Sequence, residues 1–172
     1  QLAAFPGLEY LHLPQEGITD RGVQHLAALK GLRSFSVGYS PTSKLSDKAL
    51  MAIACMEDLE SLAVGGRRIS NTGLGLIATL TGLTELRMGT DIPITARGMA
   101  HLNRLTELES LTFLPNTVVP LQALSTLRLA QLEHLKCPRL VRDAPSMRIG
   151  HLVNLQQLTL GSADRGSKQN GF

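Results

Sequence analysis

The amino-acid sequence predicts an α/β fold, a right-handed solenoid with a parallel sheet of about seven strands on its concave face and helices on its convex face. Three observations predict it. A six-residue phrase with apolar first, fourth and sixth positions occurs seven times, at spacings of 23 to 27 residues. A second phrase, an apolar residue followed by Thr or Ser, two variable residues and Gly or Ala, follows four copies. Apolar residues at helical spacing come next. Such a period indicates stacked strand-loop-helix repeats.

Each six-residue phrase predicts a short β-strand. The copies are Leu8/Leu11/Leu13, Leu32/Phe35/Val37, Leu59/Leu62/Val64, Leu83/Leu86/Met88, Leu108/Leu111/Phe113, Leu132/Leu135/Cys137 and Leu155/Leu158/Leu160. Because side chains alternate along a strand, the fourth and sixth positions point inward, and the third, fifth and seventh positions face outward. Ladders of such mid-sized aliphatic side chains build a core although only 3% of the residues are aromatic and none is Trp.

The second phrase predicts where the helices begin. Its hydroxyl residue occupies the position of a helix N-cap, where the side chain accepts a hydrogen bond from an otherwise unpaired backbone N–H. The four predicted caps are Thr19, Ser46, Ser70 and Thr95. In the fifth and sixth repeats, Val119-Pro120 and Asp143-Ala144-Pro145-Ser146 replace the phrase. These repeats are therefore expected to have shorter or displaced helices that start at proline.

The strand phrase resembles the LxxLxL core of leucine-rich repeat proteins, and the resemblance covers nearly the whole chain. Phrases such as Ile18-Thr19-Asp20-Arg21-Gly22 are similar to two groups within that family. One is the substrate-recruiting F-box type, whose repeats usually carry Cys near the helix end. The other is a set of bacterial proteins with "LTDxGL" repeats. The residues at the helix end here are Leu29, Met56, Leu80, Leu105 and Leu129, so the bacterial type is the closer match. Either resemblance implies protein–protein recognition.

The loop column that carries Asn in many leucine-rich repeats is mostly different here. Eight residues after each first Leu, the chain has Glu16, Ser40, Arg67, Asp91, Asn116, Leu140 and Ala163. Because only Asn116 matches, we expect other loop contacts to replace the usual asparagine ladder.

The predicted domain organisation is a repeat domain over 1–161 and a polar, Gly-rich tail over 162–172 that is expected to be disordered. Residues 2–8 align with 26–32, which places the start of the chain inside the helix of a preceding repeat. The sequence therefore predicts a fragment of a longer protein.

Charge and cysteine content indicate the kind of partner and the cellular location. The net charge is +3, with 7 Lys/Arg against 8 Asp/Glu in residues 1–86 and 10 against 6 in residues 87–172. This mild basic bias favours a partner with an acidic segment over nucleic acid, which calls for denser basic clusters.

No apolar run has the length of a membrane span, and the N-terminus lacks a signal-peptide layout. Two cysteines, neither in a terminal cluster, favour an intracellular location and a buried Cys137.

The histidines and Gly-rich segments, which could indicate a catalytic, metal or cofactor site, mostly recur as part of the repeat pattern. His25, His101 and His151 recur in one helical column, whereas His12 and His134 lie on outward positions about 24 Å apart, at ~4.8 Å per strand step, too far to share a metal ion. Gly73-Leu74-Gly75-Leu76-Ile77-Ala78 fits a weak dinucleotide motif without its βαβ context, and Gly65-Gly66-Arg67-Arg68 indicates a turn with two solvated arginines. No catalytic residue, metal or cofactor is predicted.

The outward strand positions form the candidate binding site. In the middle of the sheet they are mainly Ser, Ala, Gly and Thr, which would let a partner approach closely. Aromatic and basic side chains dominate binding energies at interfaces. The predicted partner-binding residues are Tyr10, His12, Tyr39, Arg87, His134, Lys136 and Arg139. Arg87 is the best single candidate, because it is the one basic outward residue of the central repeats. In the sixth repeat, Lys136, Arg139, Arg142 and Arg148 concentrate positive charge.

The sequence thus predicts a protein–protein interaction module, part of a larger intracellular protein, that binds its partner on the concave face and has no enzymatic activity. Two alternatives remain open. The repeats are the substrate-recognition part of a ubiquitin-ligase receptor, or they are a regulatory segment attached to an enzyme such as a kinase. The sequence assigns neither a partner nor an oligomeric state.

Overall fold

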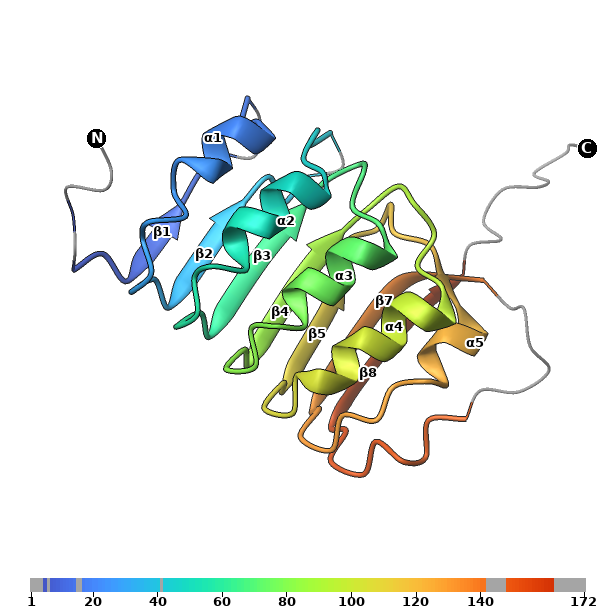
Figure 1. The fold of residues 1–172 in the computed structure, drawn as a ribbon. Helices are drawn as coiled ribbons and strands as arrows, with labels where there is room; N and C mark the ends of the chain where they lie inside the picture. Colours follow the sequence, from blue (N-terminus) through green and yellow to red (C-terminus); the bar gives the residue numbers. More distant parts are fainter. Residues whose placement is uncertain (1–4, 6, 15–16, 41, 142–147, 163–172) are drawn as a thin grey trace, which may run out of the picture.

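The computed structural model describes residues 5, 7–14, 17–40, 42–141 and 148–162. Strands and helices alternate along the chain, and the helices lie on one side of a single sheet (Figure 1). The strands are β1 (Tyr10–His12), β2 (Ser34–Val37), β3 (Ser61–Gly65), β4 (Glu85–Gly89), β5 (Ser110–Phe113), β6 (Val119–Pro120), β7 (His134–Val141) and β8 (Gln157–Ser162). The helices are α1 (Asp20–Gln24), α2 (Asp47–Ile53), α3 (Asn71–Ile77), α4 (Ala96–His101), α5 (Leu121–Leu124) and the 3-10 helix η2 (Leu102–Arg104). The predicted α/β solenoid is confirmed.

Every strand pair in the sheet is parallel. The order is β1-β2-β3-β4-β5-β7-β6, and β8 pairs with β7. The seven strands predicted from the repeated phrase therefore run side by side in chain order. The additional strand, β6, has two residues and pairs with the end of β7 at Leu140 and Val141. The register aligns equivalent phrase positions throughout: Phe35 lies opposite Leu62, and Leu62 lies opposite Leu86.

The core lies between the sheet and the helices. Side chains at the fourth phrase position form one continuous ladder, with at most 1% of each exposed in Phe35, Leu62, Leu86, Leu111 and Leu135. Side chains at the sixth position form a second buried ladder, which consists of Val37, Val64, Met88, Phe113 and Cys137. Burial of each such side chain contributes about 1.5 to 3 kcal/mol. The core is thus built mainly from repeated aliphatic side chains and contains few aromatic ones.

The helices begin at the predicted hydroxyl residues. Thr19 accepts a hydrogen bond from the Gly22 N–H, and Ser70 accepts one from the Thr72 N–H. Equivalent caps occur at Ser46 and Thr95. Each cap residue has extended backbone dihedrals, as expected where the chain enters a helix.

The residue after the cap joins one repeat to the next at three of the four caps. The Asp47 carboxylate accepts hydrogen bonds from the Ser70 N–H at 2.8 Å and from the Ser70 hydroxyl at 2.6 Å. One side chain therefore fixes the start of the following helix. Asp20 accepts the same two hydrogen bonds from Ser46, and Asn71 accepts one from the Thr95 N–H.

The later repeats depart from the regular pattern, as predicted. Helix α5 has four residues, and Pro120 precedes it as an N-cap without a side-chain hydrogen bond. The helix therefore begins one residue later than the predicted start at proline. In the sixth repeat, the predicted start over 143–146 lies outside the described residues. Residues 148–155 form turns, and no helix is assigned there.

The seventh phrase positions of the four central strands are buried, which contradicts the exposed, outward placement predicted from sequence. Gly38, Gly65 and Gly89 are buried, and Leu114 is 8% exposed. At these positions the strands end and the chain turns toward the helix layer, so neighbouring backbones pack tightly. A Cβ on Gly65 would come within 2.5 Å of the Gly38 carbonyl oxygen. The central strands consequently present two outward positions each, and the glycines do not line the face.

The two ends of the sheet differ from its middle. The core-facing side chains of β8, Leu158 and Leu160, are 41% and 37% exposed, because β8 has a strand neighbour on one side only. Strand β8 ends at Ser162, one residue inside the predicted tail, and residues 163–172 lie outside the described part of the chain. Within the described residues, no helix combines the length and apolarity that a membrane crossing requires.

Candidate functional site

One face of the sheet carries no helix within the described residues (Figure 1). Because the strands are parallel and in register, their outward positions form two rows across this concave face. The first row is Tyr10, Ser34, Ser61, Glu85, Ser110, His134 and Gln157. The second row is His12, Ser36, Ala63, Arg87, Thr112, Lys136 and Thr159. Five of the seven predicted site residues stand in these rows.

The centre of the face is a small polar cluster around Glu85. The Arg87 Nε donates to Glu85 Oε1 at 2.8 Å, and the Ser61 hydroxyl donates to Glu85 Oε2 at 2.8 Å. Arg87 was expected to be open to a partner's carboxylate, but it already forms an ion pair within its own strand. The pair is half exposed, and exposed ion pairs contribute little to stability. Glu85 therefore orients the guanidinium without burying it.

Tyr39 is electrostatically coupled to this central cluster. It follows β2 by two residues and is half-buried. Burial raises the pKa of the Tyr39 hydroxyl, while the nearby Arg87 charge lowers it and the Glu85 charge raises it. Tyr39 is thus electrostatically coupled to Arg87 and Glu85, although β3 separates β2 from β4 in the sheet order. Residue spacing does not predict this coupling, because Tyr39 lies in the loop after β2, outside the repeated strand phrase.

The other predicted residues lie toward the two ends of the face. Tyr10, which is 69% exposed, and His12 are on the short edge strand β1. His134, Lys136 and Arg139 are exposed on β7. Strands β2 to β5 lie between the two groups. The site residues therefore form a line of three groups, not one cluster.

The predicted basic cluster of the sixth repeat is divided between the two layers. Lys136 lies on the strand face, whereas the backbone N–H of Arg148 donates to the Ser125 hydroxyl at the end of α5, on the helix side. Arg142 lies outside the described residues. Among the described residues of this repeat, Lys136 thus stands in the rows of the strand face, and Arg139 is exposed further along β7.

Residues that suggested other chemistry are explained by packing. Gly73 is buried in α3, where a Cβ would come within 2.3 Å of Asp47 Oδ1, so the glycine serves contact between repeats. Gly75 packs near the His101 ring. Among the described residues, no group of three His, Cys, Asp or Glu side chains is arranged to hold a metal ion. Cys137 is buried, as predicted, and burial raises its thiol pKa to about 12.

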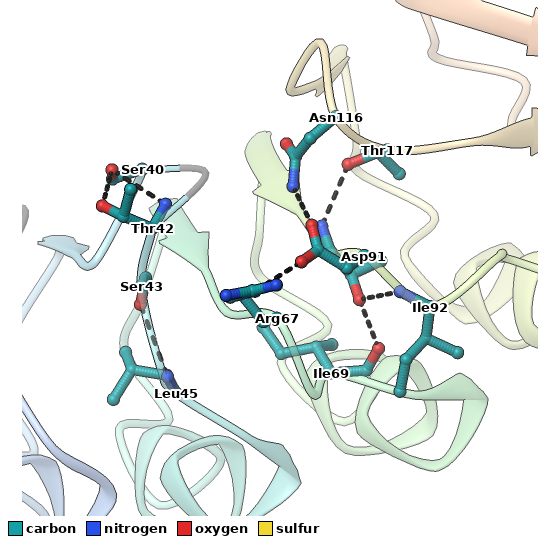
Figure 2. Close-up of polar contacts among 11 residues, drawn as sticks. Ser40, Thr42, Ser43, Leu45, Arg67, Ile69, Asp91, Ile92, Asn116 and Thr117 are labelled. Carbon is teal, nitrogen blue, oxygen red and sulfur yellow. Dashed lines mark hydrogen bonds and ion pairs between the residues drawn. The ribbon is translucent and has the colours of Figure 1, made fainter.

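The loops at the carboxyl ends of the strands are joined by contacts that replace the asparagine ladder (Figure 2). Asp91 accepts hydrogen bonds from Arg67 Nε at 2.6 Å and from Asn116 Nδ2 at 2.7 Å. These three residues occupy the same loop column in successive repeats. The Asn116 and Arg67 hydrogen bonds lower the pKa of Asp91. The expectation of other loop contacts, drawn from the mostly absent Asn column, is thus confirmed, and the opposite charges of Arg67 and Asp91 in that column could have identified their pairing.

Two buried threonines form further hydrogen bonds that connect the same loops (Figure 2). The Thr90 hydroxyl donates to the Ile69 carbonyl at 2.7 Å and accepts from the Ile92 N–H. The Thr90 N–H donates to the Thr117 hydroxyl at 3.0 Å. Because Thr90 and Thr117 are almost wholly buried, these bonds hold successive loops in fixed positions.

Comparison with known proteins supports the fold. No protein-family model matches the chain, and a search of curated proteins found no significant match. Among solved structures, the internalin inlF of Listeria monocytogenes superposes with a TM-score of 0.56 at 23% identity. The match covers 97% of this chain and 50% of that one, so the chain spans half the length of inlF. The internalin C2 of the same organism matches with a TM-score of 0.44 at 18% identity, over 92% of this chain and 83% of that one.

Proposed function

We propose that this domain is a protein–protein interaction module that binds a protein partner on its concave strand face. The observation that carries the proposal is the pair of in-register rows of exposed and partly exposed side chains on a sheet face that carries no helix among the described residues. Parallel sheets usually have both faces covered. A long uncovered face, built from seven strands with fixed spacing, offers a rigid surface for an extended partner.

The chemistry of the face favours a partner with an acidic segment. Between the end groups, the rows carry small side chains such as Ser36, Ala63 and Thr112, which leave room for a backbone or a helix to approach. Arg87 lies at the centre, and its guanidinium keeps N–H donors beyond those used by Glu85. Lys136 and Arg139 extend the positive charge along β7. A partner carboxylate placed at Arg87 would therefore face a second basic group further along the face.

Tyr10 complements this charge with apolar contact area. It is 69% exposed on β1, and large aromatic side chains commonly serve as anchors in protein interfaces. Placement of the module within a larger intracellular protein remains a prediction from the sequence.

Site-specific photo-crosslinking tests which face binds. A photoreactive amino acid placed at Ala63 or Thr112 reports on the concave face, and one placed at Gln24 or Met51 reports on exposed positions of α1 and α2. Each variant is irradiated in an extract of the source cells, and the adducts are identified by mass spectrometry. We expect the same protein adduct from both strand positions and none from the helix positions. Adducts confined to Gln24 and Met51 would contradict the proposal.

A further inference from the structure

A basic cavity lies at the carboxyl edge of the sheet, apart from the rows of the concave face. It has a volume of about 500 Å³ and is lined by Lys44, Arg67, Arg68 and Asp91. Lys44 lies in the loop between β2 and α2, the two arginines follow β3, and Asp91 follows β4. Three successive repeats therefore contribute to one cavity.

The charges in this cavity do not balance. Asp91 is the one carboxylate among the described residues that line it, and it accepts a 2.6 Å hydrogen bond from Arg67 Nε. That ion pair leaves Lys44 and Arg68, whose side chains form no hydrogen bond or ion pair with any residue that the structure describes. Two positive head groups thus share a space that is open to solvent and large enough for more than a simple ion. An anionic ligand would relieve their mutual repulsion.

The backbone holds these cations together in the absence of a ligand. The Arg67 N–H donates to the Ser43 carbonyl at 2.9 Å, and the Arg68 N–H donates to the Leu45 carbonyl at 3.3 Å. Gly66 makes this approach possible, because a Cβ there would come within 2.3 Å of the Leu45 carbonyl oxygen. Lys44 stands between the two tethered residues, Ser43 and Leu45. The loop that carries it is therefore fixed against Arg67 and Arg68.

Hydrogen bonds within the loop and on the opposite wall add to this rigidity (Figure 2). The Ser40 and Thr42 hydroxyls are 2.8 Å apart, and the Ser43 N–H donates to the Ser40 carbonyl. On the other side, Asn116 holds Asp91 in place at 2.7 Å. A site whose charged groups are already positioned loses less entropy when a ligand binds.

We propose that this cavity binds a phosphoryl group carried by a ligand. The two unpaired cations supply a charge of about +2, and a phosphate monoester carries about −1.5 to −2 at neutral pH. Arg68 offers the planar guanidinium that matches two phosphate oxygens, and Lys44 adds a flexible point charge. The cavity exceeds the size of one phosphate, so part of the attached molecule fits as well. The site is separate from the concave face and does not depend on the function proposed for it.

Titration calorimetry at constant ionic strength tests the proposal. The wild-type protein is titrated with inorganic phosphate, glucose 6-phosphate, a phosphoserine peptide and the matching unphosphorylated peptide. A Lys44→Gln/Arg68→Gln double variant removes the two unpaired cations. The matched control, Lys30→Gln/Lys48→Gln, removes two exposed cations that do not line the cavity. We expect the cavity variant to lose roughly tenfold or more in phosphate affinity and the control to bind as the wild type does.

A third variant tests the proposal in the opposite direction. Asp91→Asn removes the carboxylate that neutralises Arg67 and keeps the size of the side chain, so phosphate affinity should rise several-fold. The ligand panel then identifies the source of the phosphoryl group. Tighter binding of the phosphoserine peptide indicates a modified protein, and tighter binding of glucose 6-phosphate indicates a small phosphate ester.

Two results would overturn the proposal. One is that the wild type binds none of the phosphorylated ligands at millimolar concentration. The other is that the control double variant loses as much affinity as the cavity variant, since that would show general charge attraction. A loss confined to the cavity variant supports the site whatever the concave face binds.

Discussion

The positions of the two cysteines in the solenoid determine how reactive their thiols are. Cys137 is the sixth-position residue of its strand and is fully buried, and burial raises its thiol pKa to about 12. Cys55 follows α2 and is exposed. The thiolate is the reactive form, and burial disfavours it at Cys137, so reaction should occur at the solvent-accessible Cys55.

We therefore predict selective labelling with a thiol reagent such as DTNB at pH 8. One equivalent should react quickly, and mass spectrometry should place it on Cys55. The second thiol should react only after urea is added, because Cys137 stays protonated and covered in the folded state. A Cys55→Ser variant serves as the control and should show no rapid phase. Rapid reaction of both thiols in the native protein would contradict the placement of Cys137 in the core.

Arg87 is oriented by a neighbouring side chain before any partner binds. Its ion pair with Glu85 fixes the direction of the guanidinium, and Tyr39 lies nearby. Side chains held in place before binding lose less entropy on association. The Glu85 pair therefore favours a role for Arg87 as an anchor, provided that a partner uses the remaining N–H donors.

Helices α2, α3 and α4 each depend on the preceding helix for part of their cap. Asp47, at the start of α2, accepts two hydrogen bonds from Ser70, the cap of α3. Helices of seven residues are too short to be stable alone, so capping and packing must hold them. The Asp side chain thus stabilises the contact between repeats as well as one helix.

Replacement of Asp47 tests this contact. Asp47→Ala removes the acceptor of both hydrogen bonds from Ser70 and should lower the free energy of unfolding by about 1 to 2 kcal/mol. Lys48→Ala changes an exposed neighbour in the same helix and should alter it by less than about 0.5 kcal/mol. Urea unfolding followed by circular dichroism measures both. Equal stability of the two variants would show that the cap ladder contributes nothing.

The sequence predicts most of these elements because their cause is local and repeated. Apolar positions at a period of two specify each strand, and a hydroxyl before the helix specifies each cap. Pro120 likewise indicates the short α5 helix. The features that it misses depend on loop conformation. The glycines at the ends of β2, β3 and β4 are buried because neighbouring backbones pack closely there, and the spacing of residues does not reveal this.

The candidate site is predicted only in part for the same reason. Its rows follow from strand register, so Tyr10, His12, Arg87, His134 and Lys136 could be placed on the concave face. The pairing of Arg87 with Glu85 and the position of Tyr39 depend on side-chain and loop geometry. The basic cavity was also missed, because Lys44 and Arg68 are 24 residues apart and meet only through the Ser43 and Leu45 backbone contacts.

At the scale of the whole molecule, the solenoid separates two surfaces. Contacts within the fold run between neighbouring repeats, so helices and strands have distinct roles on opposite sides. The concave face carries the ordered rows of polar side chains, and the helix side completes the core. A change on one face should therefore leave the other face and the fold intact.

The affinity of the cross-linked partner for variants of each face is the most direct test of concave-face binding. Tyr10→Ala, Arg87→Ala and Lys136→Ala each remove an exposed strand residue, and Gln24→Ala changes the helix side as a control. Surface plasmon resonance should show at least one strand variant weakened roughly tenfold or more, as at an interface hot spot. The Lys136 change should act mainly on the association rate and its salt dependence. Unchanged affinity in all three strand variants, together with a loss in Gln24→Ala, would contradict concave-face binding.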